Sequence, residues 1–221
     1  MKPLPGACSA EFGQRAVARA VGQTAGMANL AGSEPAQHEV WLVRHGATEW
    51  SQSGRHTSTT DLPLLPGGEA AAHGIPARIA GKSFAKVLTS PLQRARRTAE
   101  LAGFPDAVVD DRLVEWAYGD YEGLTSTQIR RGDPGWNLWT HSVPNGESVA
   151  EVATRMDQVI GDLRRLDGPA LVFGHGHCLR ALAVRWLGLE VALGKYLVLG
   201  TATLSVLGWD KSYPVIERWN C

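Results

Sequence analysis

The chain has 221 residues, and 44% of them are hydrophobic, which is enough for one domain with a buried core. Lysine plus arginine and aspartate plus glutamate number 22 each, and no basic stripe is interleaved with aromatic residues, so we expect neither nucleic acid nor a membrane as partner. No apolar run approaches the ~20 residues that span a bilayer. Cys8, Cys178 and Cys221 are too far apart to indicate a disulfide framework or a metal cluster. This cysteine content favours a reducing compartment, and we expect a cytoplasmic protein.

The first 38 residues are rich in alanine and glycine and contain neither a compact apolar segment nor the cleavage site of a secretion signal. We expect a disordered N-terminal extension over residues 1–38 and one folded domain over residues 39–221. A transit peptide, a dispensable tail and a later start of translation at Met27 all remain open for this segment.

Strand and helix patterns alternate from Val40 onward. In chain order we expect a strand over 40–44, an alanine-rich helix over 67–80, a strand over 86–89, a helix over 91–102 that begins with proline, a short strand over 108–109, a short helix over 126–131, a long amphipathic helix over 148–166, a buried strand over 170–173, a helix over 179–187, and strands over 202–207 and 215–218, the last at an edge. This alternation predicts an α/β fold, a three-layer α/β/α sandwich with a mostly parallel central sheet.

Two of the predicted strands end in a histidine between polar or small neighbours. Arg44-His45-Gly46 follows the first strand, and Gly174-His175-Gly176 follows the strand over 170–173. In open α/β sheets ligands bind at the carboxyl ends of the strands, where backbone donors are free. Arg94 also lies just beyond a predicted strand, and guanidinium groups match phosphate oxygens in pairs. The sequence therefore predicts a cationic pocket for a small anion.

Glu115 adds an acidic group to these candidates. Trp116 and Tyr118 beside it predict a partly apolar setting, in which a carboxylic acid serves as a proton donor. Each candidate alone has a structural explanation, such as a buried core histidine for His175 or a surface ion pair for Glu115. Their agreement, at strand ends and beside glycines, favours a phosphoryl-transfer site.

These motifs resemble the histidine phosphatase superfamily, which includes cofactor-dependent phosphoglycerate mutases. The resemblance covers about residues 40–207 and is carried by Leu42-Val43-Arg44-His45-Gly46 with Thr48-Glu49-Trp50, Ser90-Pro91-Leu92 with Arg94-Ala95 and Thr98-Ala99, Glu115, and His175-Gly176. It implies a phosphoglycerate mutase-like fold, with residues 39–221 as the catalytic domain. It also implies that His45 is the nucleophile and that Glu115 is the general acid and base. Arg44, Arg94 and His175 would hold the phosphoryl group, and neither a metal nor another cofactor is implied.

Further residues resemble the branch with sedoheptulose-1,7-bisphosphatase and broad-specificity acid phosphatases. They lie in the segments 50–57, 60–64, 115–123, 136–139, 145–147 and 175–180. Mutases usually carry asparagine where Ser51 stands and a longer insertion between the Glu115 and His175 motifs, so this chain favours hydrolysis. His56 and Ser58 depart from the branch, which often has an aromatic residue and a glycine there, and this leaves the sugar substrate open.

The same resemblance implies which residues contact the substrate beyond the scissile phosphate. They are His56, Thr57, Tyr118, Gly176 and Arg180. Arg180 fits either a grip on a second phosphate or a helix surface. Trp136 and Trp139 fit either a lid or core packing. His177 is expected to contact residues of the site without contacting the substrate. Cys178 is expected to be a small buried residue.

The resulting prediction is a metal-independent phosphatase that hydrolyses small phosphorylated metabolites through a phosphohistidine. Sugar phosphates or bisphosphates, such as sedoheptulose 1,7-bisphosphate, are the expected substrates. A cofactor-dependent phosphoglycerate mutase and a non-catalytic phosphate-binding module are the alternatives. The oligomeric state stays open between a monomer and a homodimer.

Overall fold

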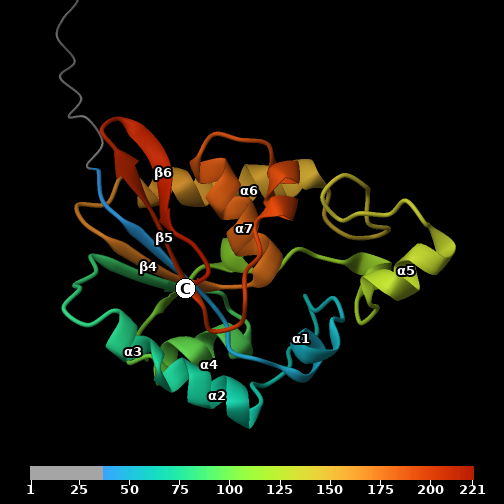
Figure 1. The fold of residues 1–221 in the computed structure, drawn as a ribbon, viewed down its shortest axis with the longest axis horizontal. Helices are drawn as coiled ribbons and strands as arrows, with labels where there is room; N and C mark the ends of the chain where they lie inside the picture. The colour runs from blue at the N-terminus through green and yellow to red at the C-terminus, as the bar shows by residue number, and fades with distance from the viewer. Residues whose placement is uncertain (1–36) are drawn as a thin grey trace, which may run out of the picture. The chain divides into compact units, whose positions relative to one another are not determined.

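A computed structural model describes residues 37–221 of the chain (Figure 1). The predicted N-terminal extension over residues 1–38 falls outside the described residues except for its last two. One of these, His38, is hydrogen-bonded through Nε2 to the carbonyl oxygen of Leu163 at 2.8 Å. No helix in residues 37–221 combines the length and the apolar character that a membrane crossing needs.

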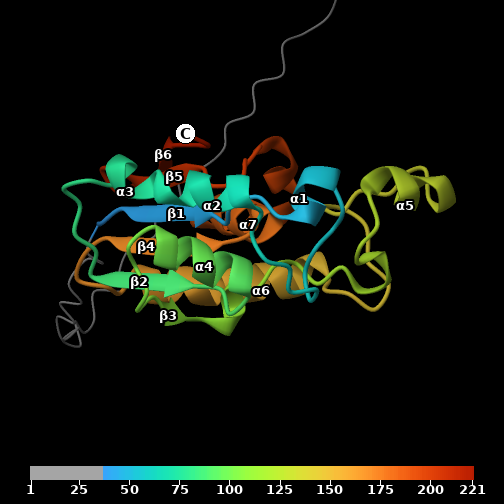
Figure 2. The same cartoon turned by 90° about the horizontal axis from the view of Figure 1, so that it is seen from below.

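The centre of the fold is a six-stranded sheet with the order β3-β2-β4-β1-β5-β6 (Figure 2). Its strands are β1 (Val40–Arg44), β2 (Lys86–Thr89), β3 (Val108–Val109), β4 (Ala170–Gly174), β5 (Leu204–Asp210) and β6 (Tyr213–Arg218). The pairings from β3 through β1 are parallel, whereas β5 is antiparallel to β1 and β6 to β5. The mostly parallel sheet with β6 at an edge is therefore confirmed.

Helices cover both faces of the sheet. In Figures 1 and 2, α2 (Pro66–His73), α3 (Ile75–Arg78) and α4 (Gln93–Leu101) lie on one face, and α6 (Val149–Leu163) and α7 (Gly176–Trp186) on the other. Alternate side chains of β1 explain why: Trp41 and Val43 join one hydrophobic cluster, and Val40 and Leu42 the other. The predicted three-layer sandwich is confirmed.

Two short helices lie beyond the sheet, past the carboxyl end of β1. They are α1 (Glu49–Ser53) and α5 (Ser126–Gly132), seen at the right of Figure 1. The segments around them pass the strand ends at which the two predicted histidines lie. This part of the chain therefore supplies side chains to the site without taking part in the sheet.

Several predicted helix boundaries are wrong, for local reasons. The expected helix over 67–80 is broken into α2 and α3 at Gly74, with Pro76 in the first turn of the second helix. The helix expected to start at Pro91 begins at Gln93, because Leu92 has extended backbone angles. The helix expected to start at 179 begins three residues earlier, with His175 at its N-cap. In each case the strands that hold the site stay where the sequence predicts them.

Candidate active site

The sheet register places the two histidines side by side. Arg44 at the end of β1 pairs with Gly174 at the end of the parallel strand β4, and His45 and His175 follow directly. Their ring centroids lie 5.1 Å apart, and both side chains are buried. The carboxyl edge of the sheet thus brings together two titratable rings that are far apart in the sequence.

The His45 ring is held as one tautomer. Its Nδ1 donates to the carbonyl oxygen of Gly46 at 2.7 Å, which leaves the lone pair on Nε2. The Gly46 amide in turn donates to Thr98 Oγ1 at 3.0 Å. Burial, together with Arg44 and Arg94, lowers the pKa of His45 well below its ordinary value. His45 is therefore neutral near pH 7, with Nε2 able to act as a nucleophile.

A cavity of about 240 Å³ opens at this edge of the sheet. Arg44 reaches it with one Nη group held by the carbonyl oxygen of Leu199 at 2.5 Å, whereas its buried Nε has no hydrogen-bond partner in the described part of the chain. The cavity is lined by Arg44, His45, Ser51, Gly54, Arg55, His56, Thr57, Glu115, Tyr118, Ser126, Gly176, His177, Arg180 and Leu199. An anion in this cavity would meet the Nη donors of Arg44 that are not bonded to Leu199.

Arg94 and His175 lie beside His45 but behind the wall of this cavity, and both are fully buried. Arg94 Nε donates to His175 Nδ1 at 3.2 Å, and its Nη groups donate to carbonyl oxygens of the loop over 57–60. Because Nδ1 accepts that bond, Nε2 of His175 carries the proton and donates to Ser90 Oγ at 2.7 Å. Burial and Arg94 lower the pKa of His175 well below its ordinary value.

Glu115 also lines the cavity, and its carboxylate accepts hydrogen bonds from three backbone amides. Trp116 donates at 2.9 Å, and His177 and Cys178 donate at 3.0 and 2.8 Å. The last two amides belong to the first turn of α7, whose N-terminus carries a partial positive charge. The helix that starts after His175 therefore also fixes the carboxylate of Glu115.

Three rings form the outer wall of the cavity. His56 packs on Tyr118 and His177 with centroid distances of 4.7 and 5.9 Å, and the Tyr118 hydroxyl is hydrogen-bonded to His177 Nδ1 at 2.6 Å. Burial lowers the pKa of His56 to about 4 and that of His177 well below its ordinary value, and it raises the pKa of Tyr118. All three rings are uncharged near pH 7, so this wall offers hydrogen bonds without charge.

Arg180 supplies the charge that this wall lacks. Its Nε donates to the carbonyl oxygen of Gly194 at 3.0 Å, and its guanidinium lies 4.5 Å from the ring centre of Trp139. Neither Nη group has a hydrogen-bond partner among residues 37–221. A β-carbon at Gly194 would lie 2.4 Å from the Trp139 ring, so glycine is needed for this arrangement. The guanidinium is thus held in place with two donor groups available.

The two tryptophans belong to the core. Trp136 and Trp139 are 2% and 5% exposed and belong to the hydrophobic cluster that also contains buried residues of α6 and α7, which favours the core interpretation over a lid. They also line an adjoining cavity of about 180 Å³, which shares His56, Ser126 and His177 with the first and is also lined by Lys195. Cys178 is buried, as predicted.

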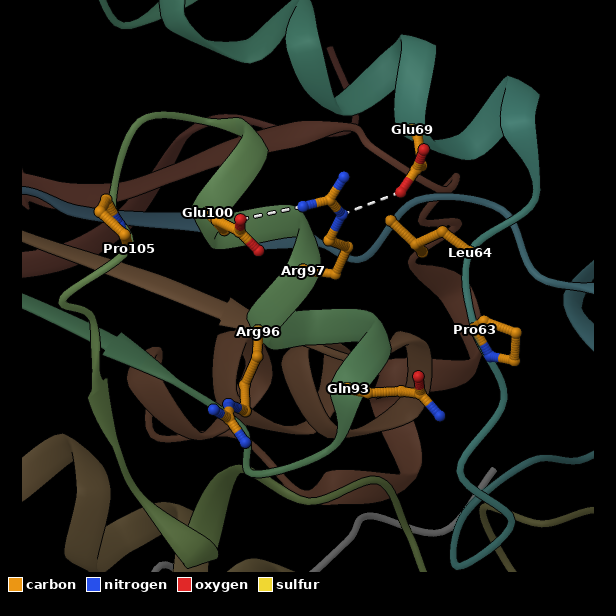
Figure 3. Close-up of a pocket in the computed structure, with 8 residues that line it drawn as sticks. All are labelled: Pro63, Leu64, Glu69, Gln93, Arg96, Arg97, Glu100 and Pro105. Atoms are coloured by element: carbon orange, nitrogen blue, oxygen red, sulfur yellow. Dashed lines mark hydrogen bonds and ion pairs between the residues drawn. The ribbon is translucent and has the colours of Figure 1, made fainter.

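A larger hollow of about 490 Å³ lies elsewhere, between α2 and α4 (Figure 3). Its prominent cation, Arg97, is paired with Glu69 at 2.8 Å and Glu100 at 2.9 Å. None of the residues predicted for the site lines it. Size therefore does not identify the reactive cavity in this molecule, whereas the convergence of His45, Arg44 and Glu115 does.

Some residues of the site were not predicted from the sequence. Ser51, Arg55, Ser126 and Leu199 line the cavity although no role was predicted for them. Ser90 belongs to a motif that carried the resemblance, and its bond to His175 gives that motif a physical reason. Within residues 37–221, no group of three or more His, Cys, Asp or Glu side chains is arranged to hold a metal ion.

Comparison with known proteins identifies the family. The model of the histidine phosphatase superfamily (branch 1) matches residues 40–221. The chain belongs to this superfamily. Among its relatives is a Mycobacterium tuberculosis acid phosphatase, 38% identical over 182 residues that cover 78% of this chain and 87% of that protein. A Saccharomyces cerevisiae sedoheptulose 1,7-bisphosphatase is 37% identical over 187 residues, 68% of each chain.

The fold agrees with these relatives. The solved structure of an open reading frame product from Mycobacterium tuberculosis superposes on this chain with a TM-score of 0.80 and 36% identity, covering 83% of this chain and 97% of that one. The predicted phosphoglycerate mutase-like fold is therefore confirmed. This histidine phosphatase is a phosphoric monoester hydrolase.

Proposed function

We propose that this histidine phosphatase hydrolyses sugar phosphates or bisphosphates, such as sedoheptulose 1,7-bisphosphate, in the cytoplasm, through a phosphohistidine at His45 and without a metal ion. One observation carries the proposal: His45 is a neutral ring whose Nδ1–H donates to the Gly46 carbonyl oxygen, in a cavity that Arg44 and Glu115 also line. This arrangement supplies a nucleophile, a cation and a proton carrier at one place.

In the first step Nε2 of His45 attacks phosphorus, and the bond from phosphorus to the ester oxygen breaks. The Nη donors of Arg44 that are not bonded to Leu199 offset the negative charge on the non-bridging oxygens. Protonated Glu115 transfers its proton to the leaving alkoxide. The products of this step are the free alcohol and phosphohistidine.

In the second step a water molecule attacks the phosphohistidine, and Glu115, now ionised, removes a proton from that water. The bond between phosphorus and His45 breaks, and inorganic phosphate leaves. Two easier displacements thus replace one difficult displacement. The ring of His45 returns to its neutral state with the Nδ1 hydrogen bond to Gly46 intact.

We assign Arg94 and His175 the role of binding the phosphoryl group. Arg94 already lowers the pKa of His45 through its charge, which keeps the nucleophile neutral. Direct contact would require Arg94 to exchange its bonds to the carbonyl oxygens of Thr57 and Ser58 for phosphate oxygens. Such an exchange replaces neutral acceptors by a charged one and is favourable.

The outer cavity supports a sugar phosphate as substrate. His56, Tyr118 and His177 are uncharged and polar, which suits the hydroxyl groups of a sugar chain. Arg180, held on Trp139, has two donor groups for a second phosphate, which favours a bisphosphate. One relative is a sedoheptulose 1,7-bisphosphatase, in agreement with this choice.

The test is phosphate release by the purified protein in the presence of EDTA, across sugar mono- and bisphosphates and 3-phosphoglycerate, with His45→Ala as control. We expect release from sugar phosphates that is lost in the variant, and a phosphohistidine that can be trapped by rapid denaturation. Formation of 2-phosphoglycerate only when 2,3-bisphosphoglycerate is added would instead identify a mutase. Binding of vanadate without any turnover would identify a binding module.

A further inference from the structure

Glu115 lies in a stretch with no regular secondary structure. It stands between the short helices η1 (Asp111–Leu113) and η2 (Gly119–Tyr121), so neither a helix nor a strand ladder fixes residues 114–118. The polar backbone groups of this buried stretch therefore depend on side chains and loops for their hydrogen bonds. Those partners decide where the carboxyl group of Glu115 lies.

Two side chains supply the partners on both sides of Glu115. Arg155 Nη1 donates to the carbonyl oxygens of Arg112 at 2.8 Å and Val114 at 3.1 Å. Glu147 Oε2 accepts the backbone amide of Ala117 at 2.9 Å. The backbone is thus held immediately before Glu115 and two residues after it.

Glu147 and Arg155 are also bound to each other by two parallel hydrogen bonds. Arg155 Nε lies 2.7 Å from Oε1 of Glu147, and Nη2 lies 2.9 Å from Oε2. This paired geometry is the strong form of an arginine–carboxylate contact. The Arg155 side chain is 12% exposed and the Glu147 side chain 21%, and neither lines the cavity. We call this ion pair the Glu147–Arg155 clasp.

The clasp also touches the helix that receives the carboxylate. Arg155 Nη1 lies 3.6 Å from Cys178 Sγ, and the amide of Cys178 donates to Glu115 Oε1. Arg155 projects from α6, so it connects that helix both to the stretch that carries Glu115 and to the first turn of α7. Arg155 therefore links the stretch that carries Glu115 to the first turn of α7. The distance between these two parts sets the position of the Glu115 carboxyl group.

We infer that Glu147 and Arg155 are positioning residues that set where Glu115 delivers its proton. This inference rests on the proposed function of Glu115 as general acid. Loosening the clasp leaves the nucleophile and Arg44 in place but displaces the proton donor. The resulting loss of rate depends on how much the leaving group needs a proton: a sugar alkoxide needs one, and p-nitrophenolate does not.

The experiment compares kcat/KM for p-nitrophenyl phosphate and for an alkyl ester, glycerol 3-phosphate, in Glu147→Gln and Arg155→Met. We expect the alkyl ester to lose on the order of 10- to 100-fold and p-nitrophenyl phosphate less than about 3-fold. Arg155→Lys is expected to restore part of the loss. A matched control is Arg185→Met, which removes another paired ion pair between α7 and α6, with Asp157 at 2.8 Å, away from Glu115.

Equal losses on the two esters would overturn the inference, because a merely structural defect lowers the fraction of active protein and scales both rates alike. Glu115→Gln tests the role of Glu115 as general acid separately from the positioning role of the clasp. If it loses both esters equally, the proposed acid is wrong and the inference falls with it. If it loses mainly the alkyl ester while the clasp variants do not, only the inference falls. Should Glu147→Gln fail to fold, Glu147→Asp and Arg155→Lys carry the same comparison.

Discussion

His45 and His175 lie with their ring centroids 5.1 Å apart, and each ring is fixed by a different hydrogen bond. Nδ1–H of His45 donates to the Gly46 carbonyl oxygen, and Nε2–H of His175 donates to the Ser90 hydroxyl oxygen. Two neutral rings with defined tautomers thus stand at adjacent strand ends. The Ser90 hydroxyl therefore belongs to the site, because it fixes the tautomer and the orientation of the His175 ring.

We predict that Ser90→Ala lowers kcat for a sugar phosphate by about 10-fold, because the buried N–H of His175 loses its acceptor. The same loss is expected to cost about 1–3 kcal/mol in the free energy of unfolding. Steady-state kinetics and urea denaturation measure the two effects. Ser53→Ala, at an exposed hydroxyl, is the control, and an unchanged kcat in Ser90→Ala would contradict the role given to this contact.

We predict that Arg180→Met raises KM about 10-fold for a sugar bisphosphate while changing KM for the matching monophosphate little, because only the bisphosphate uses the two free Nη groups. Paired kinetics on the two esters provide the measurement. Lys195→Met is the informative comparison, since Lys195 lines the adjoining cavity. If that variant, and not Arg180→Met, weakens the bisphosphate, the second phosphate binds further out.

We predict that Gly194→Ala destabilises the protein by about 1–3 kcal/mol, because the added methyl group overpacks the Trp139 ring, 2.4 Å away. Displacement of Trp139 also removes the surface on which Arg180 rests, so KM for a bisphosphate should rise. Denaturation and kinetics together check this. Gly132→Ala, where a methyl group meets nothing, serves as reference, and a Gly194→Ala variant as stable as the parent would refute the packing argument.

We predict a loss of stability in acid that depends on His56. Its folded pKa is about 4, whereas the unfolded chain binds this proton at its ordinary pKa of 6.5. The stability from the neutral ring is therefore complete above about pH 6.5 and is lost as the pH falls toward 4, by up to about 3 kcal/mol. Urea denaturation from about pH 7.5 to about pH 4.5 should show a smaller decline in His56→Phe than in the parent. His73→Gln, at an exposed histidine, should keep the full decline; equal slopes in all three would reject this assignment.

The residues at this edge of the sheet could be predicted because short apolar runs indicate buried strands. The residues that follow parallel strands meet at one edge of the sheet. His45 and His175 were found in this way. The break at Gly74 was also visible in principle, since glycine and Pro76 interrupt helices. The alanine-rich pattern over 67–80 favours an unbroken helix, whereas Gly74 and Pro76 determine where the first helix ends.

The contacts of the irregular segments could not be predicted. Arg94 bonds to carbonyl oxygens of the loop over 57–60, which has no periodic pattern that would indicate its path. The sequence predicts Arg155 only as a polar residue of an amphipathic helix. Its contacts with the stretch around Glu115 depend on how α6 packs in the folded protein. Interactions of this kind depend on the tertiary structure, whereas a single sequence indicates local preference.

The segments that carry Tyr118, Ser126 and Trp136 run between β3 and α6, largely beyond the sheet (Figure 1). The nucleophile His45 instead follows β1 directly, and the two arginines belong to β1 and to α4, the helix after β2. Loops outside a sheet accept insertions and exchanges of sequence that strands do not. Changes in residues 118–143 can therefore alter which metabolite such a chain accepts while His45, Arg44, Arg94 and Glu115 stay the same.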